Sequence, residues 1–397
     1  MRILFTGIPE DSRFSYDGWL CGAAGLSRKK SNRVSDLLDN HRLAGNTGNA
    51  LIGEGATRML DCDRSHSVYL SLARLHARSK DIKEYQSTLN KFDSIVLSCA
   101  NMLRSNYDVG MSLVEALENA QIPIYVFGLG IQQPLNQAQQ KAIQLHPNTA
   151  RCLAVLNEKA RIFGTRGYTT SSALAELGYK NSIPLGCPSF FLYPENFLLI
   201  EPTHRLTRLA TGGYLGKKDA KEFKTIQKIA SAQVDLSYVF QDEIKNYGMD
   251  AAFRNQLNDY SDAWGELNSD KINWHLQTLY GSQLENTKYF LFFSPSQWRT
   301  FNSFMDGYIG CRIHGALSML QVAKPAVVVY PDLRVKEFAD FFALPSIPMQ
   351  QILAQDIQSS LEIFGDQPTI EKFKDTYRVR HQNLADQLSQ YGLKLKM

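Results

Sequence analysis

DGYIGCRIHGALSMLQVAKPAVVVYP, residues 306–331, decides how the second half of the chain folds. The stretch begins with a short apolar run from Tyr308 to Cys311, continues as a helical pattern from Ala316 to Val322, and ends with the apolar run from Ala326 to Tyr330. A strand, a crossover helix and a second strand in this order form a βαβ unit with parallel strands. The stretch therefore predicts an open α/β sheet.

The turn between the first strand and the helix carries Arg312, Ile313 and His314. Ligands of open α/β sheets bind outside the carboxyl ends of the strands, where this turn lies. A helix N-terminus offers free N–H groups, and a guanidinium is a planar fork suited to a carboxylate or phosphate. Histidine exchanges protons near neutral pH. We predict that Arg312 and Ile313 bind substrate and that His314 is catalytic. In the alternative interpretation, Arg312 pairs with a buried carboxylate and His314 caps the helix.

The rest of the chain repeats the alternation of apolar runs and helical patterns, which is typical of βα units and a mostly parallel sheet. Further strands are expected at 3–5, 92–97, 122–127, 162–164, 182–185, 234–240 and 289–293, and helices at 51–60, 68–77, 111–120 and 169–177. The pattern loses its periodicity around residues 193–211. We therefore predict a first Rossmann-like domain over 1–200 and a second over 201–397. A C-terminal helix over 369–390 has an apolar face that can pack back on the first domain.

Length and composition limit the classes of protein to which the chain can belong. With 397 residues and 44% hydrophobic residues, the chain can bury two cores. Its 43 basic and 39 acidic residues give a net charge of +4, too small and too dispersed for a nucleic-acid binder. The six cysteines form no CxxC pair, which indicates reduced thiols in a cytoplasm. We find no signal peptide and no apolar run long enough to span a bilayer, so at most peripheral contact with the inner face of a membrane is expected.

A second strand-to-helix turn carries Arg166, within FGTRGYTTSS at residues 163–172. Arg166 precedes Gly167, and hydroxyl side chains follow that can cap the first N–H groups of the helix. The turn therefore predicts a second anion site, although hydroxyl residues are also ordinary helix caps and an arginine at such a turn can simply be exposed.

A loop rich in Gly and Asn, HRLAGNTGNA at residues 41–50, leads into a helix. Its glycines permit close approach of a ligand to the backbone. We predict that it contributes substrate-binding residues, namely Gly45, Asn46, Gly48 and Asn49; a simple turn is the alternative.

Two other kinds of site are not predicted. The segment Gly128–Gly130 lacks the third glycine of a dinucleotide fingerprint, because Gln133 stands in its place. Asp61, Asp63 and His66 follow no metal-ligand pattern. We therefore expect no organic cofactor and no metal site.

Taken in order, four segments resemble the polysaccharide pyruvyl transferase family. GNTGN at 45–49 is similar to its early GNxGD loop, and TRGYTTSSALAELG at 165–178 to its Arg-Asp-x-x-Ser helix start. GCPSFF at 186–191 is similar to its Asp-Pro-x-Phe element. RIHGALSMLQVAKPAVVVY at 312–330 resembles the family's Arg-Leu-His turn followed by a helix, Gly-x-Pro and a strand, and it is the most specific of the four.

The resemblance implies a cytoplasmic transferase with two Rossmann-like domains facing a cleft, as in GT-B glycosyltransferases. It also implies that the domain over 1–200 lies on the acceptor side and the domain over 201–397 on the donor side. In the family, residues at the positions of Arg166, Arg312 and His314 are associated with binding phosphoenolpyruvate and with catalysis. Arg334 lies where the family often has a basic residue after its last strand, so it is also expected to bind substrate. The implied reaction moves the enolpyruvyl group of phosphoenolpyruvate onto a sugar of a polysaccharide or of its lipid-linked precursor, as a ketal, in exopolysaccharide biosynthesis.

The chain departs from the family pattern at three acidic positions. Asn49, Gly167 and Cys187 stand where the family has aspartate, and Ser98–Asn101 replaces a glycine-rich strand end. Carboxylates at these positions would help to position the arginines and the acceptor, and this chain lacks them. Two alternatives to pyruvyl transfer therefore stay open: a nucleotide-sugar glycosyltransferase on the same fold, and a catalytically silent binding or scaffold protein of an envelope-polysaccharide system.

Overall fold

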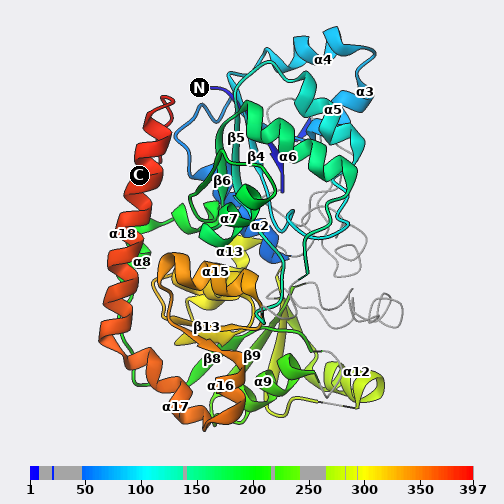
Figure 1. Ribbon diagram of the computed structural model, residues 1–397. Coiled ribbons are helices and arrows are strands. Elements are labelled where there is room, and N and C mark those ends of the chain that lie inside the picture. The colour runs from blue at the N-terminus through cyan, green and yellow to red at the C-terminus, as the bar shows by residue number, and fades with distance from the viewer. Residues whose placement is uncertain are drawn as a thin grey trace.

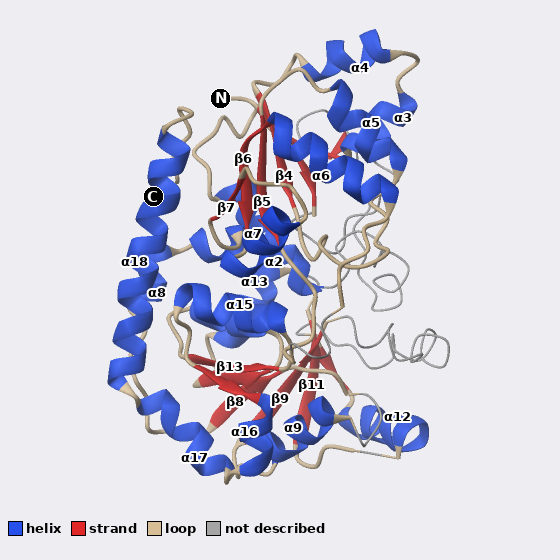
Figure 2. Cartoon of the chain, viewed as in Figure 1, coloured by secondary structure: helices blue, strands red, loops and turns tan. Residues whose placement is uncertain are grey.

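A computed structural model describes residues 1–8, 20–21, 47–136, 141–215, 220–241, 265–281, 283–292 and 294–396. These residues form two α/β domains, each built on a seven-stranded sheet. In Figure 1 the two sheets lie one above the other, and the C-terminal helix runs along one side of both. Figure 2 shows that helices α2, α13 and α15 lie between the two sheets.

The first sheet has the strand order β2-β3-β1-β4-β5-β6-β7. Its strands are β1 (Ile3–Gly7), β2 (Leu20–Cys21), β3 (Val68–Leu70), β4 (Ser94–Ser98), β5 (Ile124–Leu129), β6 (Ala160–Thr165) and β7 (Ser182–Pro184). All neighbours pair in parallel except β2 with β3. β4 and β5 are buried along their whole length, which explains why they appear in the sequence as continuous apolar runs.

The helices of the first domain lie in the crossovers between its strands. They are α2 (Thr47–Arg58), α3 (Leu72–Arg78), α4 (Ile82–Leu89), α5 (Met111–Asn119), α6 (Pro147–Lys159), α7 (Tyr168–Glu176), the 3-10 helix η2 (Pro188–Phe191) and α8 (Pro194–Leu198). The predicted single helix over 68–77 is wrong. Its first three residues form β3, where Val68 pairs with Leu4 of β1, and Ser71 then caps α3. A three-residue strand is too short for its alternation to differ from helical spacing.

The second sheet has the order β10-β11-β9-β8-β12-β13-β14. Its strands are β8 (Arg208–Thr211), β9 (Asp235–Phe240), β10 (Glu266–Leu267), β11 (Thr287–Leu291), β12 (Gly307–Gly310), β13 (Ala326–Tyr330) and β14 (Ser346–Pro348). β12 and β13 pair in parallel, as the opening stretch predicts. Sequence reasoning did not find β8, because Arg208 is exposed and the segment before it has no apolar periodicity.

The helices of the second half include one that returns to the first domain. They are α9 (Lys221–Ala230), α12 (Ser269–Tyr280), α13 (Pro295–Asn302), α14 (Ile313–Leu320), α15 (Leu333–Phe342), α16 (Met349–Ala354), α17 (Ile357–Leu361), the 3-10 helix η4 (Glu362–Gly365) and α18 (Gln367–Ser389). Tyr377 of α18 donates a hydrogen bond to the Phe190 carbonyl at 2.8 Å. Its ring stacks on Phe197. None of the helices within the described ranges is both long and apolar enough to cross a bilayer.

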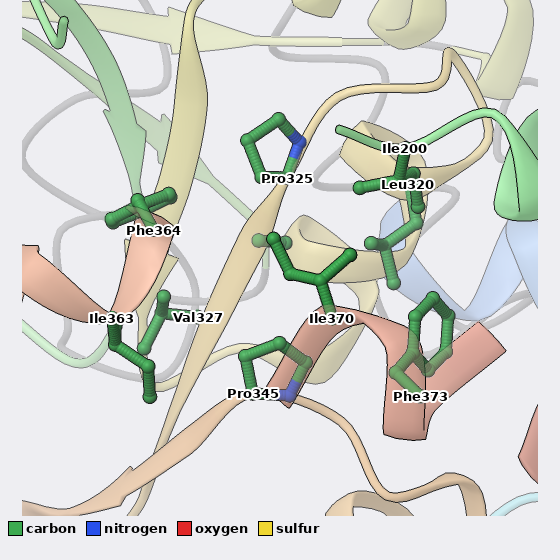
Figure 3. A pocket seen from close by; sticks show the side chains of 10 residues that line it. Ile200, Leu320, Pro325, Val327, Pro345, Ile363, Phe364, Ile370 and Phe373 are labelled. Atoms are coloured by element: carbon green, nitrogen blue, oxygen red, sulfur yellow. The ribbon is translucent and has the colours of Figure 1, made fainter. Parts of the chain in front are cut away.

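The start of α18 packs on the second domain around a small apolar pocket. Figure 3 shows Ile370 and Phe373 of α18 facing Leu320 of α14 and Val327 of β13. The cavity measures about 10 Å³, too small for a ligand. We therefore interpret it as a packing seam and not as a binding site.

A buried ion pair joins the two domains. Glu54 of α2 accepts two hydrogen bonds from Arg299 of α13, at 2.7 and 2.8 Å. Both residues are at most 8% exposed. Arg299 also donates to Gln321, whose amide donates to the Ser189 carbonyl of the first domain. The contact orients α2, whose first turn lies near the site described below.

Both sheets reverse their direction of winding at one point: between β1 and β4 in the first, and between β8 and β12 in the second. Ligands of such sheets bind at these switch points, outside the carboxyl ends of the strands. The predicted fold class, an α/β protein with two Rossmann-like domains, is confirmed.

Candidate active site

His314 lies in the first turn of α14, directly after β12 and its switch point. The residue is 8% exposed, and its Nε2 is buried without a hydrogen-bond partner among the described residues. Gly48 of α2 contacts the other side of the ring: a Cβ added at Gly48 would lie 3.0 Å from His314 Nδ1. Residues of both domains therefore enclose the imidazole.

Arg166 reaches the same region from the first domain, where it follows β6. It is 2% exposed; its Nε donates to the Gly128 carbonyl at 2.8 Å and its Nη1 to Asn101 Oδ1 at 2.5 Å. Its Nη2 is buried and has no hydrogen-bond partner in the described part of the chain. These bonds hold the guanidinium rigidly and leave one donor available for a ligand.

Arg334 lies in the first turn of α15, after β13. Its Nη2 donates to Asp332 Oδ2 at 3.2 Å, and Asp332 caps the helix by accepting from the Val335 N–H. Its Nε is buried without a partner among the residues described. Arg334 Nε is therefore, within the described ranges, a second buried donor without a partner.

The charged side chains of the site shift one another's pKa values. The pKa of His314 is well below its usual value, because of burial and then the positive charges of Arg166, Arg334 and Arg312. Burial, with Arg334 nearby, also lowers the pKa of Arg166. Positive charges that are buried close together repel one another and disfavour a further positive charge on the imidazole. Burial and the three arginine charges therefore oppose protonation of His314.

Arg312 and Ile313 have mostly structural contacts in this ligand-free arrangement. The Arg312 guanidinium lies 3.6 Å from the centroid of the Tyr214 ring, and its backbone N–H donates to Tyr308 Oη at 3.2 Å. Ile313 is 6% exposed and its side chain is part of an apolar core. At this position a ligand would meet the backbone N–H of the helix N-terminus, so substrate binding by Arg312 and Ile313 stays a prediction.

The predicted Gly/Asn loop is described only in part. Gly48 and Asn49 lie in the first turn of α2, while Gly45 and Asn46 lie outside the described residues. Thr47, between these two pairs, has a buried hydroxyl with no partner among the residues described. The substrate-binding role of this loop stays a prediction. Within the described ranges, no three His, Cys, Asp or Glu side chains come together as a metal site would need.

Sequence reasoning missed Glu222 of α9. Its Oε2 accepts a hydrogen bond from the Tyr214 N–H at 3.0 Å, and the ring of the same Tyr214 stacks on the Arg312 guanidinium. Burial raises the pKa of Glu222 to about 7, against the opposing effect of Arg312. A glutamate with this pKa exchanges protons near neutral pH. Nothing in the local sequence KEFK marks it.

Glu222 should make the stability of the protein depend on pH. Because its pKa is raised in the folded state, its contribution to stability is complete below pH 4.5 and is lost as pH rises through about 7. Glu222→Gln should therefore gain up to about 3 kcal/mol relative to wild type between pH 5 and 8. Urea unfolding at both pH values measures this. The exposed Glu362→Gln is the control, and a difference independent of pH would contradict the prediction.

The two Rossmann-like domains define a two-domain α/β protein. The model of the family described as polysaccharide pyruvyl transferase matches residues 46–332. The chain belongs to this family. No curated protein matches the sequence.

Several solved structures are similar at low sequence identity. Anabaena HepE in complex with UDP is 12% identical, with a TM-score of 0.49 over 98% of this chain and 100% of that one. Sucrose-phosphate synthase from Thermosynechococcus elongatus is 10% identical, with a TM-score of 0.47 over 97% and 95%. UDP-GlcNAc 2-epimerase from Neisseria meningitidis, bound to UDP-GlcNAc, is 10% identical, with a TM-score of 0.44 over 98% and 100%.

Proposed function

We propose that the protein transfers the enolpyruvyl group of phosphoenolpyruvate to a sugar and forms a pyruvate ketal. One observation carries the proposal: Arg166 Nη2 and Arg334 Nε, from different domains, are buried without a partner among the described residues, and the charges of both arginines act on a neutral His314. Family membership supports a transferase of this kind. The two donors and the helix N-terminus suit a small ligand that has two anionic groups.

Phosphoenolpyruvate fits this requirement because it carries a carboxylate and a phosphate. Arg166 would donate through Nη2 and Arg334 through Nε, each as a charge-assisted hydrogen bond. The first N–H groups of α14 would donate hydrogen bonds to an anionic group at the helix N-terminus. Arg312, at the N-cap of this helix, would complete the clamp.

The charge state of His314 determines what it can do at each stage. In the free protein its depressed pKa leaves it neutral at pH 7, so it can act only as a base. A bound dianion offsets the repulsion from the arginines and raises this pKa. His314 can then take up a proton and transfer it to the enol methylene, which becomes a methyl group.

The remaining steps follow from the cation that protonation creates. A sugar hydroxyl attacks the cationic carbon and loses its proton to the imidazole. The C–O bond to phosphate breaks, and a second hydroxyl of the same sugar attacks the same carbon and loses its proton to the departing phosphate. The products are a cyclic ketal and inorganic phosphate, and the scheme requires no metal ion or organic cofactor. We propose that the acceptor is a polysaccharide repeat unit, free or on a lipid carrier at the inner face of the membrane.

Phosphate release from defined donors tests the proposal. The purified protein would be offered phosphoenolpyruvate or UDP-sugars with galactosyl, mannosyl and glucosyl acceptors. Phosphate release that needs both phosphoenolpyruvate and a sugar is the expected result. UDP release would instead support a glycosyltransferase, and no reaction with any donor would support a scaffold protein.

A matched pair of variants connects the activity to the site. Arg166→Met removes the Nη2 donor, which has no partner among the described residues, whereas Arg161→Met changes an exposed arginine on β6, the strand that Arg166 follows. Only the first should weaken binding of phosphoenolpyruvate, measured by calorimetry. Equal effects of the two variants would contradict the assigned role of Arg166.

A further inference from the structure

The N-terminus of α7, next to Arg166, is capped by a residue of the other domain. Gly167 is the N-cap residue and has no side chain to accept the first N–H groups. Instead, Glu337 of α15 accepts the Thr170 N–H through Oε1 at 2.6 Å and the Thr170 hydroxyl through Oε2 at 2.7 Å. A carboxylate at this position does what an N-cap aspartate normally does.

Gly167 is the residue that makes room for this contact. A Cβ at Gly167 would lie 2.7 Å from Glu337 Cγ, closer than real Cβ contacts come. The Gly167 backbone is extended, with φ of −176°, so any residue can adopt its conformation. Space, and not backbone strain, therefore excludes a side chain at 167 while Glu337 is present.

Glu337 is also the carboxylate that acts on Arg166. The hydrogen bonds of Arg166 go to an uncharged carbonyl and an amide. Cys187 and Cys99 lie near its guanidinium, but burial raises the pKa of both thiols, so they are neutral. Glu337 is 4% exposed and favours the charged form of Arg166; burial raises the pKa of Glu337 itself, against the opposing effects of its hydrogen bonds to Thr170 and of Arg166. It therefore stabilises a buried cation that lacks a direct ionic partner in the described part of the chain.

The same helix holds other groups of the site. Phe338 follows Glu337, and its ring centroid lies 5.0 Å from the Arg166 guanidinium carbon. Arg334 lies one turn earlier on α15. One short helix of the second domain therefore contacts Arg166 from the first domain and also supplies Arg334.

We propose that Glu337 is a positioning residue: it caps α7 across the domain boundary, serves as the counter-charge of Arg166, and so sets Arg166 against Arg334 and His314. It supplies from the second domain the carboxylate that the family pattern places at position 167. The consequence for phosphoenolpyruvate binding rests on the proposed function, whereas the capping of α7 does not.

Exchanging the two side chains tests the proposal. Glu337→Ala should weaken phosphoenolpyruvate binding about tenfold or more, since a charge-assisted contact is lost. Gly167→Asp alone should also weaken it, because the new side chain collides with Glu337. The double variant Gly167→Asp/Glu337→Ala places a local cap and counter-charge at 167, and it should restore affinity to within about threefold of wild type. The exposed Asp340→Asn on the same helix is the control and should bind like wild type.

Two readouts separate this proposal from the proposed function. Calorimetry with phosphoenolpyruvate reports on the ligand, and hydrogen exchange of the Thr170 amide reports on the cap without any ligand. Faster Thr170 exchange in Glu337→Ala, slowed again in the double variant, is expected even if phosphoenolpyruvate does not bind. Unchanged exchange in Glu337→Ala, or a double variant no better than Glu337→Ala in exchange, would overturn the proposal. If exchange responds and the wild type binds no phosphoenolpyruvate, only the proposed function fails.

Discussion

His314→Ala is expected to lower turnover by roughly 10²- to 10⁴-fold, the usual contribution of a general acid–base group. The imidazole is the uncharged member of the site, and its depressed pKa makes it a base in the free protein. Because Arg166 and Arg334 carry the proposed anion contacts, the variant should bind phosphoenolpyruvate within a few-fold of wild type. Single-turnover phosphate release and calorimetry measure the two quantities separately.

The pH dependence of the same reaction gives a second measure of His314. Because His314 must carry a proton to transfer it to the enol methylene, and burial and three arginines lower its pKa, the basic limb of kcat/KM should begin below pH 6.5. His314→Gln, which keeps a polar side chain of similar size, should lose both turnover and this limb. His381→Gln is the control, because His381 packs against Phe191 and Tyr377 on α18. A His314 variant with full turnover would remove the catalytic role.

The sequence predicted most of the described strands, because buried parallel strands appear as continuous apolar runs. β13 begins and ends at the predicted residues, and α7 ends just before Gly178, as expected of a helix closed by glycine. β3 and β8 could not be predicted in the same way. β3 is too short to show a period, and β8 follows a segment without apolar spacing.

The residues of the candidate site also fall into those that the sequence predicted and those that it did not. Arg166 and His314 lie at strand-to-helix turns, which sequence reasoning can find, and the structure brings them within electrostatic reach of each other. Asn101, Glu222 and Glu337 could not be found, because each acts through contacts with residues distant in sequence. Glu337, for example, contacts Thr170 across 167 positions of the chain. A missing aspartate at one position does not show which distant residue replaces it.

The ion pair between Glu54 and Arg299 should account for the largest single loss of stability. Both residues are buried, and the pair is bidentate, at 2.7 and 2.8 Å. Glu54→Gln leaves the Arg299 guanidinium buried without a countercharge, which typically costs about 3–5 kcal/mol. The free energy of unfolding in urea should fall by this amount. Because α2 also carries Gly48 beside His314, ligand affinity should fall as well.

A double replacement distinguishes the cost of an unpaired charge from the value of the pair. Glu54→Leu/Arg299→Met removes both charges and fills similar space, so it should recover most of the stability lost in Glu54→Gln. Asp375→Asn, which breaks the exposed pair with Arg378, should change little. If Glu54→Gln unfolds like wild type, the pair does not hold the domains together. If the double variant is stable but binds ligand poorly, the charges act mainly by fixing how α2 and α13 face each other across the cleft.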